Sequence, residues 1–69
     1  MERQAVTSSN VASVGYDGET LTLEIEFNNG TVYQYFDVTE QIYNELISAG
    51  SVGAYLAANI KGRFRFSKV

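Results

Sequence analysis

The chain has 69 residues, 45% of them hydrophobic and 19% charged, and its formal net charge is −3. A chain of this length folds as one domain, expected over residues 1–69, and buries only about 60% of the surface that its unfolded form exposes. It contains no cysteine and no histidine, which excludes disulfides and the usual zinc ligands.

The charges are divided along the chain. All eight acidic residues precede position 61, whereas four of the five basic residues follow position 60: Lys61, Arg63, Arg65 and Lys68. Typical nucleic-acid binders carry a basic stripe instead, so we expect this tail to fold back and neutralise the acidic body. The polar start and the lack of a long apolar run predict neither a signal peptide nor a membrane span, and a cytoplasmic protein is expected.

The first predicted strand lies in "NVASVGYDG", residues 10–18, and ends in a turn at Asp17 and Gly18. Glycine in the middle of a strand indicates a bulge or the close approach of another group, which we expect at Gly15. Alternation along this strand assigns Val11 and Ser13 to the outer face and three residues to the core, namely Ala12, Val14 and Tyr16.

The second strand, "LTLEIEF", alternates strictly over residues 21–27. Its core-facing residues are Leu21, Leu23, Ile25 and Phe27, and its outward residues are Thr22, Glu24 and Glu26. Asn29-Gly30 then suits a two-residue type I′ hairpin turn. That turn places Phe27 opposite Val32, Ile25 opposite Gln34 and Leu23 opposite Phe36, so that Tyr33 and Tyr35 share the exposed face with the two glutamates.

Helical spacing replaces alternation after Asp37. Thr39 is a predicted N-cap between the hydrophobic-staple positions Val38 and Tyr43, and Gly50 is a predicted C′ residue. Ser51 can cap a second helix that Gly62 ends. The apolar positions of the two helices are Ile42, Leu46 and Ile47 in the first, and Val52, Tyr55, Leu56 and Ile60 in the second.

A last strand is predicted in "RFRF", residues 63–66. Phe64 and Phe66 would complete the core, and Arg63 and Arg65 would share the opposite face, near the two glutamates. Together these elements predict an α+β fold: a three- or four-stranded antiparallel sheet with two short helices packed on one face.

Four stretches resemble one known family: "VTSSNVASVGYD" (6–17), "LEIEFNNGTVYQY" (23–35), "IYNELISAGSVGAY" (42–55) and "IKGRF" (60–64). The chain resembles the KTSC domain, which is found at the C-terminus of some lysyl-tRNA synthetases and as a stand-alone bacterial protein. Tyr33-Gln34-Tyr35 matches the Y-x-Y signature of that family. The resemblance implies a single KTSC-like domain whose role is not established, with RNA binding suggested by its attachment to a synthetase.

The candidate site consists of Tyr33, Tyr35, Arg63 and Arg65. Exposed tyrosines on a sheet can stack bases, at about 1–3 kcal/mol per base, and the arginines could contact phosphates. Two hypotheses follow: RNA or tRNA binding through this Tyr-x-Tyr face, or a protein-interaction or homodimerisation role of an aromatic sheet face. The structural alternative is that the tyrosines only pack across strands and the arginines are solvated or paired with the acidic body.

An enzyme is not expected. Glu24 and Glu26 could serve acid–base chemistry or a divalent cation, but no third ligand is nearby, and a solvated face is the favoured interpretation. Ser8 and Ser9 have no histidine to activate them and are expected in a turn or cap. No cofactor and no metal are predicted.

Overall fold

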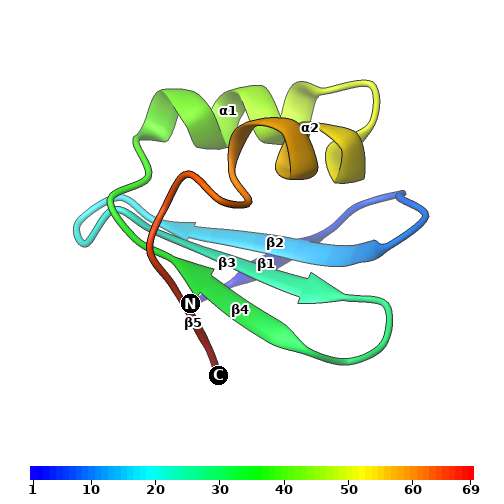
Figure 1. Ribbon diagram of the computed structural model, residues 1–69, viewed down its shortest axis with the longest axis horizontal. Helices are drawn as coiled ribbons and strands as arrows, with labels where there is room; N and C mark the ends of the chain where they lie inside the picture. The colour runs from blue at the N-terminus through cyan, green and yellow to red at the C-terminus, as the bar shows by residue number, and fades with distance from the viewer.

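The computed structural model describes residues 1–69 as a five-stranded antiparallel sheet covered on one face by two helices (Figure 1). The strands follow one another across the sheet in chain order, and the helices lie between β4 and β5 in the sequence. The bounds are β1 Arg3–Ala5, β2 Val11–Asp17, β3 Thr22–Phe27, β4 Val32–Tyr35, α1 Glu40–Ser48, α2 Val52–Asn59 and β5 Phe66–Lys68.

The predicted α+β class and the two helices on one face are confirmed. The strand count differs, since β1 is a fifth strand that the sequence did not indicate. Its three residues are all exposed and show no apolar alternation. β1 exists because it pairs with β2, where Arg3 lies opposite Gly15.

A three-residue loop, not the predicted two-residue turn, joins β3 to β4. The Phe27 amide donates to Thr31 O at 2.8 Å, the Gly30 amide donates to Phe27 O at 2.9 Å, and Gly30 has a φ of 91°. This arrangement is typical of a turn followed by a left-handed residue, which glycine adopts at low cost. The Asn29 side chain stabilises it by accepting hydrogen bonds from the Thr31 amide at 3.1 Å and from Thr31 Oγ1 at 2.7 Å.

The longer loop moves β4 by one residue relative to β3. Tyr35 lies opposite Leu23, and Tyr33 lies opposite Ile25. Cross-strand partners share a face, so both tyrosines lie on the side covered by the helices, here called the helix face. The prediction that Tyr33 and Tyr35 are exposed beside the two glutamates is therefore wrong: Tyr35 is only 3% exposed, and Tyr33 is half-buried.

The orientation of β3 is as predicted, because Leu23 and Ile25 are fully buried, but Leu21 precedes the strand and is 39% exposed instead of joining the core. The shift of β4 adds the large apolar ring of Tyr35 to this core and takes the Gln34 amide out of it. Burying an aromatic ring stabilises the folded state, whereas burying an amide that lacks a hydrogen-bond partner destabilises it. The two arrangements differ only in β4, so alternation in β3 alone could not distinguish them.

A bulge in β2 changes which of its residues are buried. The register shifts between Val11 and Ser13, with Val11 opposite Phe27 and Ser13 opposite Glu26. Val11 is consequently 1% exposed instead of facing outward as predicted, and Ala12 is only half-buried. The bulge lets two residues of β2 occupy the space of one, so the alternation expected from the sequence fails at this point.

The predicted close approach at Gly15 is confirmed. A Cβ atom at this position would lie 2.6 Å from the carbonyl oxygen of Glu2, so a side chain here would displace the backbone that leads into β1. Glycine at this position thus allows the fifth strand to pair.

Both helix caps are as predicted. Thr39 Oγ1 accepts from the Ile42 amide at 3.3 Å, and Ser51 Oγ accepts from the Ala54 amide at 3.2 Å. Gly62 has a φ of 79° and ends the segment after α2, whereas Gly50 does not adopt the left-handed conformation expected of it. The helices cover a core of eleven buried residues: Val11, Val14, Leu23, Ile25, Phe27, Tyr35, Val38, Leu46, Val52, Leu56 and Ile60.

The last strand begins later than predicted. Phe64 packs partly buried against the core, as expected, but Phe66 starts β5 and is 60% exposed.

Arg65 does not join the glutamates, because its Nη2 pairs with Asp37 Oδ2 at 3.1 Å. Both members of this ion pair are largely solvated, so it contributes at most about 1 kcal/mol.

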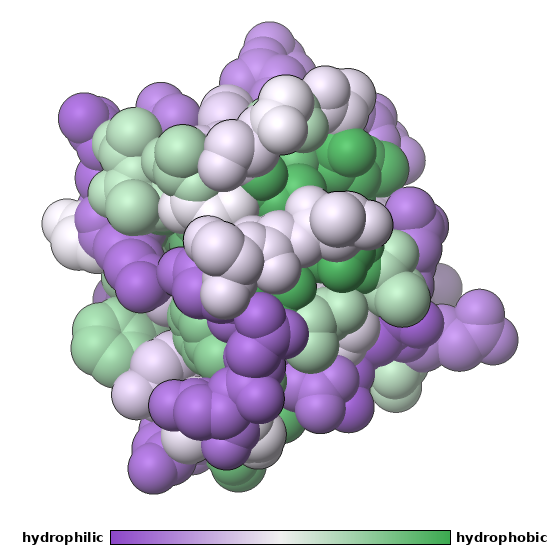
Figure 2. All heavy atoms as spheres, turned by 90° about the vertical axis from the view of Figure 1, so that its right-hand side faces the viewer, coloured by the Kyte–Doolittle hydropathy of each residue, from purple (hydrophilic) through white to green (hydrophobic).

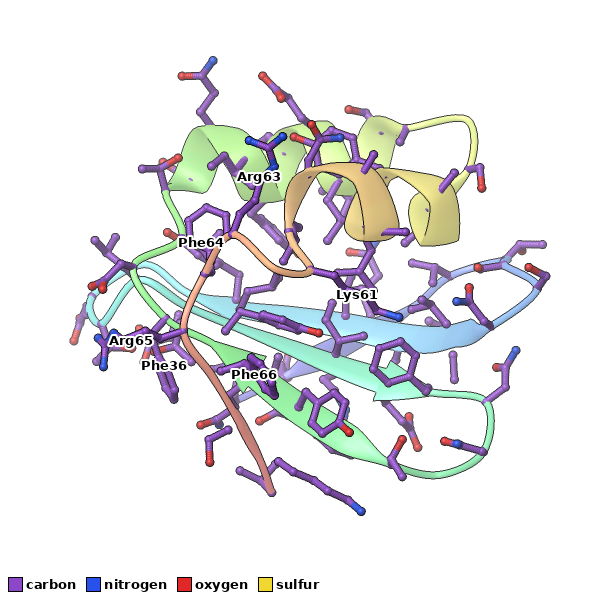
Figure 3. The ribbon with its side chains drawn as sticks, in the orientation of Figure 1. Phe36, Lys61, Arg63, Phe64, Arg65 and Phe66 are labelled. Atoms are coloured by element: carbon purple, nitrogen blue, oxygen red, sulfur yellow. The ribbon has the colours of Figure 1, made fainter.

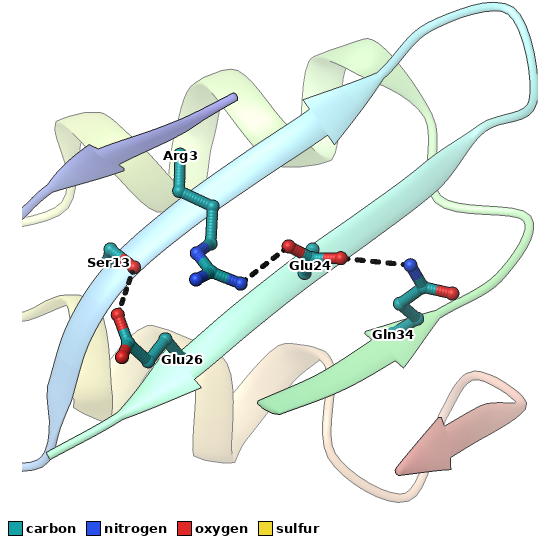
Figure 4. A network of polar contacts seen from close by, with 5 residues as sticks. All are labelled: Arg3, Ser13, Glu24, Glu26 and Gln34. Carbon is teal, nitrogen blue, oxygen red and sulfur yellow. Dashed lines mark hydrogen bonds and ion pairs between the residues drawn. The ribbon is translucent and has the colours of Figure 1, made fainter. Parts of the chain in front are cut away.

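The other face of the sheet, here called the open face, carries a polar network (Figure 4). Glu24 accepts hydrogen bonds from Arg3 Nη1 at 2.7 Å and from Gln34 Nε2 at 2.9 Å, and Ser13 Oγ donates to Glu26 Oε1 at 2.8 Å. Glu24 is only 9% exposed, so the solvated-face interpretation is wrong for this residue. The hydrogen bond from Gln34, together with the hydrogen bond and charge of Arg3, lowers the pKa of Glu24 and outweighs burial, which raises it.

The Gly15→Ala variant should lose about 1–3 kcal/mol of unfolding free energy, because the added methyl group forces β1 away from β2. Gly18→Ala is the matched control, since its Cβ would meet only Tyr16 Cε2 at an ordinary 3.7 Å. Urea unfolding of both variants measures the difference. Equal stabilities for the two variants would contradict the tight approach of β1.

Glu24→Gln should lower stability at neutral pH and remove part of its pH dependence. The folded-state pKa of Glu24 lies below its ordinary value of 4.5, so its contribution is present above pH 4.5 and is lost as pH falls further. The difference in unfolding free energy between wild type and Glu24→Gln should therefore shrink as pH falls from 4.5. Glu19→Gln, an exposed change in the β2–β3 turn, should give a small difference at every pH.

Candidate functional site

A groove runs across the helix face where the sheet extends beyond the helices, and it consists of two adjoining hollows. The polar hollow, of about 400 Å³, lies at the β3–β4 loop and is lined mainly by Ser9, Asn10, Phe27, Asn28, Asn29 and Thr31. The apolar hollow, of about 260 Å³, lies over β4 and β5 and is lined by Tyr35, Gly62 and Phe66. Tyr33 and Lys61 line both hollows, and we call the whole the aromatic groove.

The end of α2 positions Lys61 over the groove. The amides of Ile60 and Lys61 both donate to Leu56 O, at 3.0 and 2.9 Å, and Gly62 then turns the chain through a left-handed conformation. Ile60 is fully buried and anchors this segment. Lys61 consequently extends between α2 and the sheet (Figure 3), with Nζ 5.1 Å from the ring centroid of Phe27. A cation at this distance from an aromatic face is stabilised by about 0.5–1 kcal/mol.

Three aromatic rings form the floor of the groove. Tyr33 stands edge-on to Phe27, with centroids 5.7 Å apart, and edge-on to Phe66 on its other side, with centroids 5.8 Å apart. Tyr35 supplies a buried wall, 5.9 Å from Phe66. Burial raises the pKa of Tyr35, and the neighbouring Tyr33 raises it further, so its phenol is neutral at physiological pH. Phe66, at 60% exposure, leaves an aromatic surface available to a ligand.

The groove is positively charged in an otherwise acidic protein. Lys61 is the only basic residue among those that line the two hollows, and no carboxylate is among them. Lys68 lies opposite Tyr33 in the β4–β5 ladder and therefore shares the helix face. By contrast, Glu24 and Glu26 lie on the open face. On the side of the molecule seen in Figure 2, hydrophobic residues show only in separate patches between hydrophilic ones.

The structure separates the four residues predicted to form the site. Tyr33 and Tyr35 lie in the aromatic groove, the first half-buried and the second as part of the core. Arg65 lies beside Phe36, with its Cζ 5.6 Å from the ring centroid, and Arg63 extends toward the helices (Figure 3). Neither arginine lines the groove.

Sequence reasoning missed the partners of Tyr33, namely Phe27, Lys61 and Phe66. The sequence predicts both phenylalanines in a closed core, because alternation does not show where a sheet extends beyond its helices. The charge pattern groups Lys61 with the three other basic residues of the tail. Its place next to Gly62, the residue predicted to end the second helix, was the one available signal that it differs from the two arginines.

The structure contains no cluster of three or more Asp, Glu, His or Cys residues positioned to hold a metal ion. Neither of its two helices has the length and apolar character needed to cross a bilayer.

Comparisons with known proteins agree on one family. The KTSC domain profile matches residues 7–64. The crystal structure of a KTSC domain protein from Yersinia pestis has a TM-score of 0.94 and 40% sequence identity, over 99% of this chain and 96% of that one. A protein of Tsukamurella paurometabola is 34% identical over 62 residues, which cover 90% of this chain and 92% of the relative.

A second kind of relative is much longer. The lysine–tRNA ligase of Nostoc punctiforme is 38% identical over 61 residues, which make up 88% of this chain but only 11% of the ligase. The matched residues 7–64 include β2, β3, β4 and both helices. The resemblance indicated by Tyr33-Gln34-Tyr35 is thus confirmed, and the chain belongs to the KTSC domain family.

Proposed function

We propose that the chain is a non-catalytic module that binds single-stranded RNA in the aromatic groove. The observation that carries this proposal is the half-exposed aromatic floor of Tyr33 and Phe66 beside Lys61, in a groove without a carboxylate. Single-stranded RNA is recognised by stacking its bases on aromatic rings and by pairing its phosphates with cations. The lysine–tRNA ligase relatives act, by their name, on a tRNA.

The distribution of charge supports this ligand despite the net charge of −3. Lys61 and Lys68 can contact phosphates on the helix face. The carboxylate of Glu24 is neutralised by Arg3 on the open face, on the other side of the sheet. Phosphates in the groove would therefore meet two lysines before any carboxylate.

A binding role fits the groove better than catalysis. Its polar groups are amides, hydroxyls, the phenol of Tyr33 and the ammonium group of Lys61, and nucleophilic catalysis requires a nucleophile with a base placed to activate it. Stacking and amide hydrogen bonds, by contrast, require only the groups that are present.

Lys61→Gln and Lys68→Gln should each weaken the binding of a labelled single-stranded RNA and flatten its salt dependence. Each lost phosphate contact should reduce the slope of log K against log salt concentration by about 0.7. Arg63→Gln and Arg65→Gln remove the same charge outside the groove and serve as matched controls. Fluorescence anisotropy at several salt concentrations measures the slopes. Equal effects of all four variants would indicate that the basic tail as a whole attracts RNA, and would contradict binding in the aromatic groove.

Phe66→Ala should reduce RNA affinity at least about fivefold, because a stacked base contributes about 1–3 kcal/mol. The substitution should leave the fold intact, since Phe66 is 60% exposed. Phe36→Ala, which removes an aromatic ring from the other face of the sheet, is the control and should bind normally.

Light scattering of the same two variants distinguishes RNA binding from the protein-contact alternative. A wild-type dimer that Phe66→Ala converts to a monomer, together with no RNA binding at low salt, would replace the proposal by self-association through β5. The short length of β5 and the presence of Lys68 on it argue against such pairing, since both are features that protect sheet edges.

A further inference from the structure

The two hollows of the groove differ in the chemistry that they offer to a base. Phe66 and the two tyrosines give the apolar hollow aromatic rings but few hydrogen-bonding groups. Three asparagines surround the polar hollow, and each has an amide that is only partly used within the protein. The apolar hollow therefore cannot distinguish one base from another, whereas the polar hollow can form hydrogen bonds with a base.

Internal hydrogen bonds fix which end of each amide remains free. Asn29 Oδ1 accepts from Thr31, which leaves Nδ2 as a free donor. Asn10 Oδ1 accepts from Ser8 Oγ at 3.1 Å, which likewise leaves its Nδ2 free. Asn28 Nδ2 donates to Ser9 O at 3.1 Å, which leaves its Oδ1 as a free acceptor.

The backbone sets the order of these three residues. The Asn28 amide donates to Asn10 O at 2.8 Å, and Asn29 follows Asn28 in the chain. Along the backbone, Asn28 therefore neighbours both Asn10 and Asn29. A base edge that met the three side chains in this backbone order would face a donor, an acceptor and a donor.

Uracil carries the complementary pattern on its Watson–Crick edge, where two carbonyl acceptors flank one N–H donor. Cytosine offers the same number of acceptors and donors, but its amino donor stands at one end of the edge, next to two acceptors. Guanine has one acceptor and two donors, and adenine has only one of each. Among the four bases, only uracil matches the order of the asparagines.

We propose that the aromatic groove holds two successive nucleotides, with uridine in the polar hollow and any base stacked in the apolar hollow. Lys61 lines both hollows and lies where the joining phosphate would pass. This inference rests on the proposed function, because it assigns bases to the groove that the proposal assigns to RNA. It predicts that the nucleotide in the polar hollow is selected by its base and that the nucleotide in the apolar hollow is not.

The test compares the labelled hexanucleotides U6, C6 and A6 by anisotropy with wild-type protein. U6 should bind at least about fivefold more tightly than C6, which has the same ring size and charge and differs at the base edge. U6 should also bind more tightly than A6, although stacking alone favours the larger adenine ring.

Asn29→Asp is the decisive variant. It keeps the Oδ1 acceptor that holds Thr31 and replaces only the free donor, so the loop should fold and melt as in the wild type. The U6-to-C6 affinity ratio should fall toward one, whereas Asn44→Asp, the same charge change on exposed α1, should leave it unchanged. Phe66→Ala should weaken U6 and C6 by the same factor and keep the ratio.

The outcomes separate the two proposals. Binding that depends on Lys61 but is equal for U6 and C6 overturns the uridine assignment and leaves RNA binding in place. A ratio that Phe66→Ala changes as much as Asn29→Asp overturns the division into two unlike hollows. Absence of binding by all three hexanucleotides at low salt overturns both proposals.

Discussion

The left-handed glycine at position 30 determines the arrangement of the whole helix face. With φ at 91°, Gly30 closes a three-residue loop, and that loop sets the register of β4 against β3. The register in turn directs Tyr33 and Tyr35 toward the helices and Gln34 toward Glu24 on the open face. A two-residue turn would exchange the two sets and leave neither the aromatic groove nor the polar network intact.

Much of the fold was predictable because it depends on local signals. The alternation of β3, the caps Thr39 and Ser51, and the need for glycine at position 15 all act within a few residues or through simple sterics. The errors arose where two local solutions differ by a single residue, as at the β3–β4 loop and the β2 bulge. There, the choice depends on which side chains the rest of the core accepts, and no short stretch of sequence contains that information.

The candidate site was only half predictable for the same reason. Tyr33 was identified because two nearby tyrosines follow a hairpin, but two of the three residues around it come from a distant part of the chain. Phe27 precedes the loop, Lys61 follows α2 and Phe66 begins β5. Arg63 and Arg65 alternate with Phe64 and Phe66 in the sequence, yet the late start of β5 separates them from the groove. Their charges suggested a contact with phosphates, but Arg65 pairs with Asp37 and Arg63 extends toward the helices.

The two ends of the chain lie on opposite edges of the sheet, since β1 and β5 are its outermost strands. Of these two edges, only the C-terminal one lines the groove, through Phe66, and Lys68 lies beside it, opposite Tyr33. A domain or affinity tag joined after Val69 would thus stand at the rim of the groove and compete with incoming ligands for space. The same attachment ahead of Met1 would emerge beside β1 and leave the entrance clear.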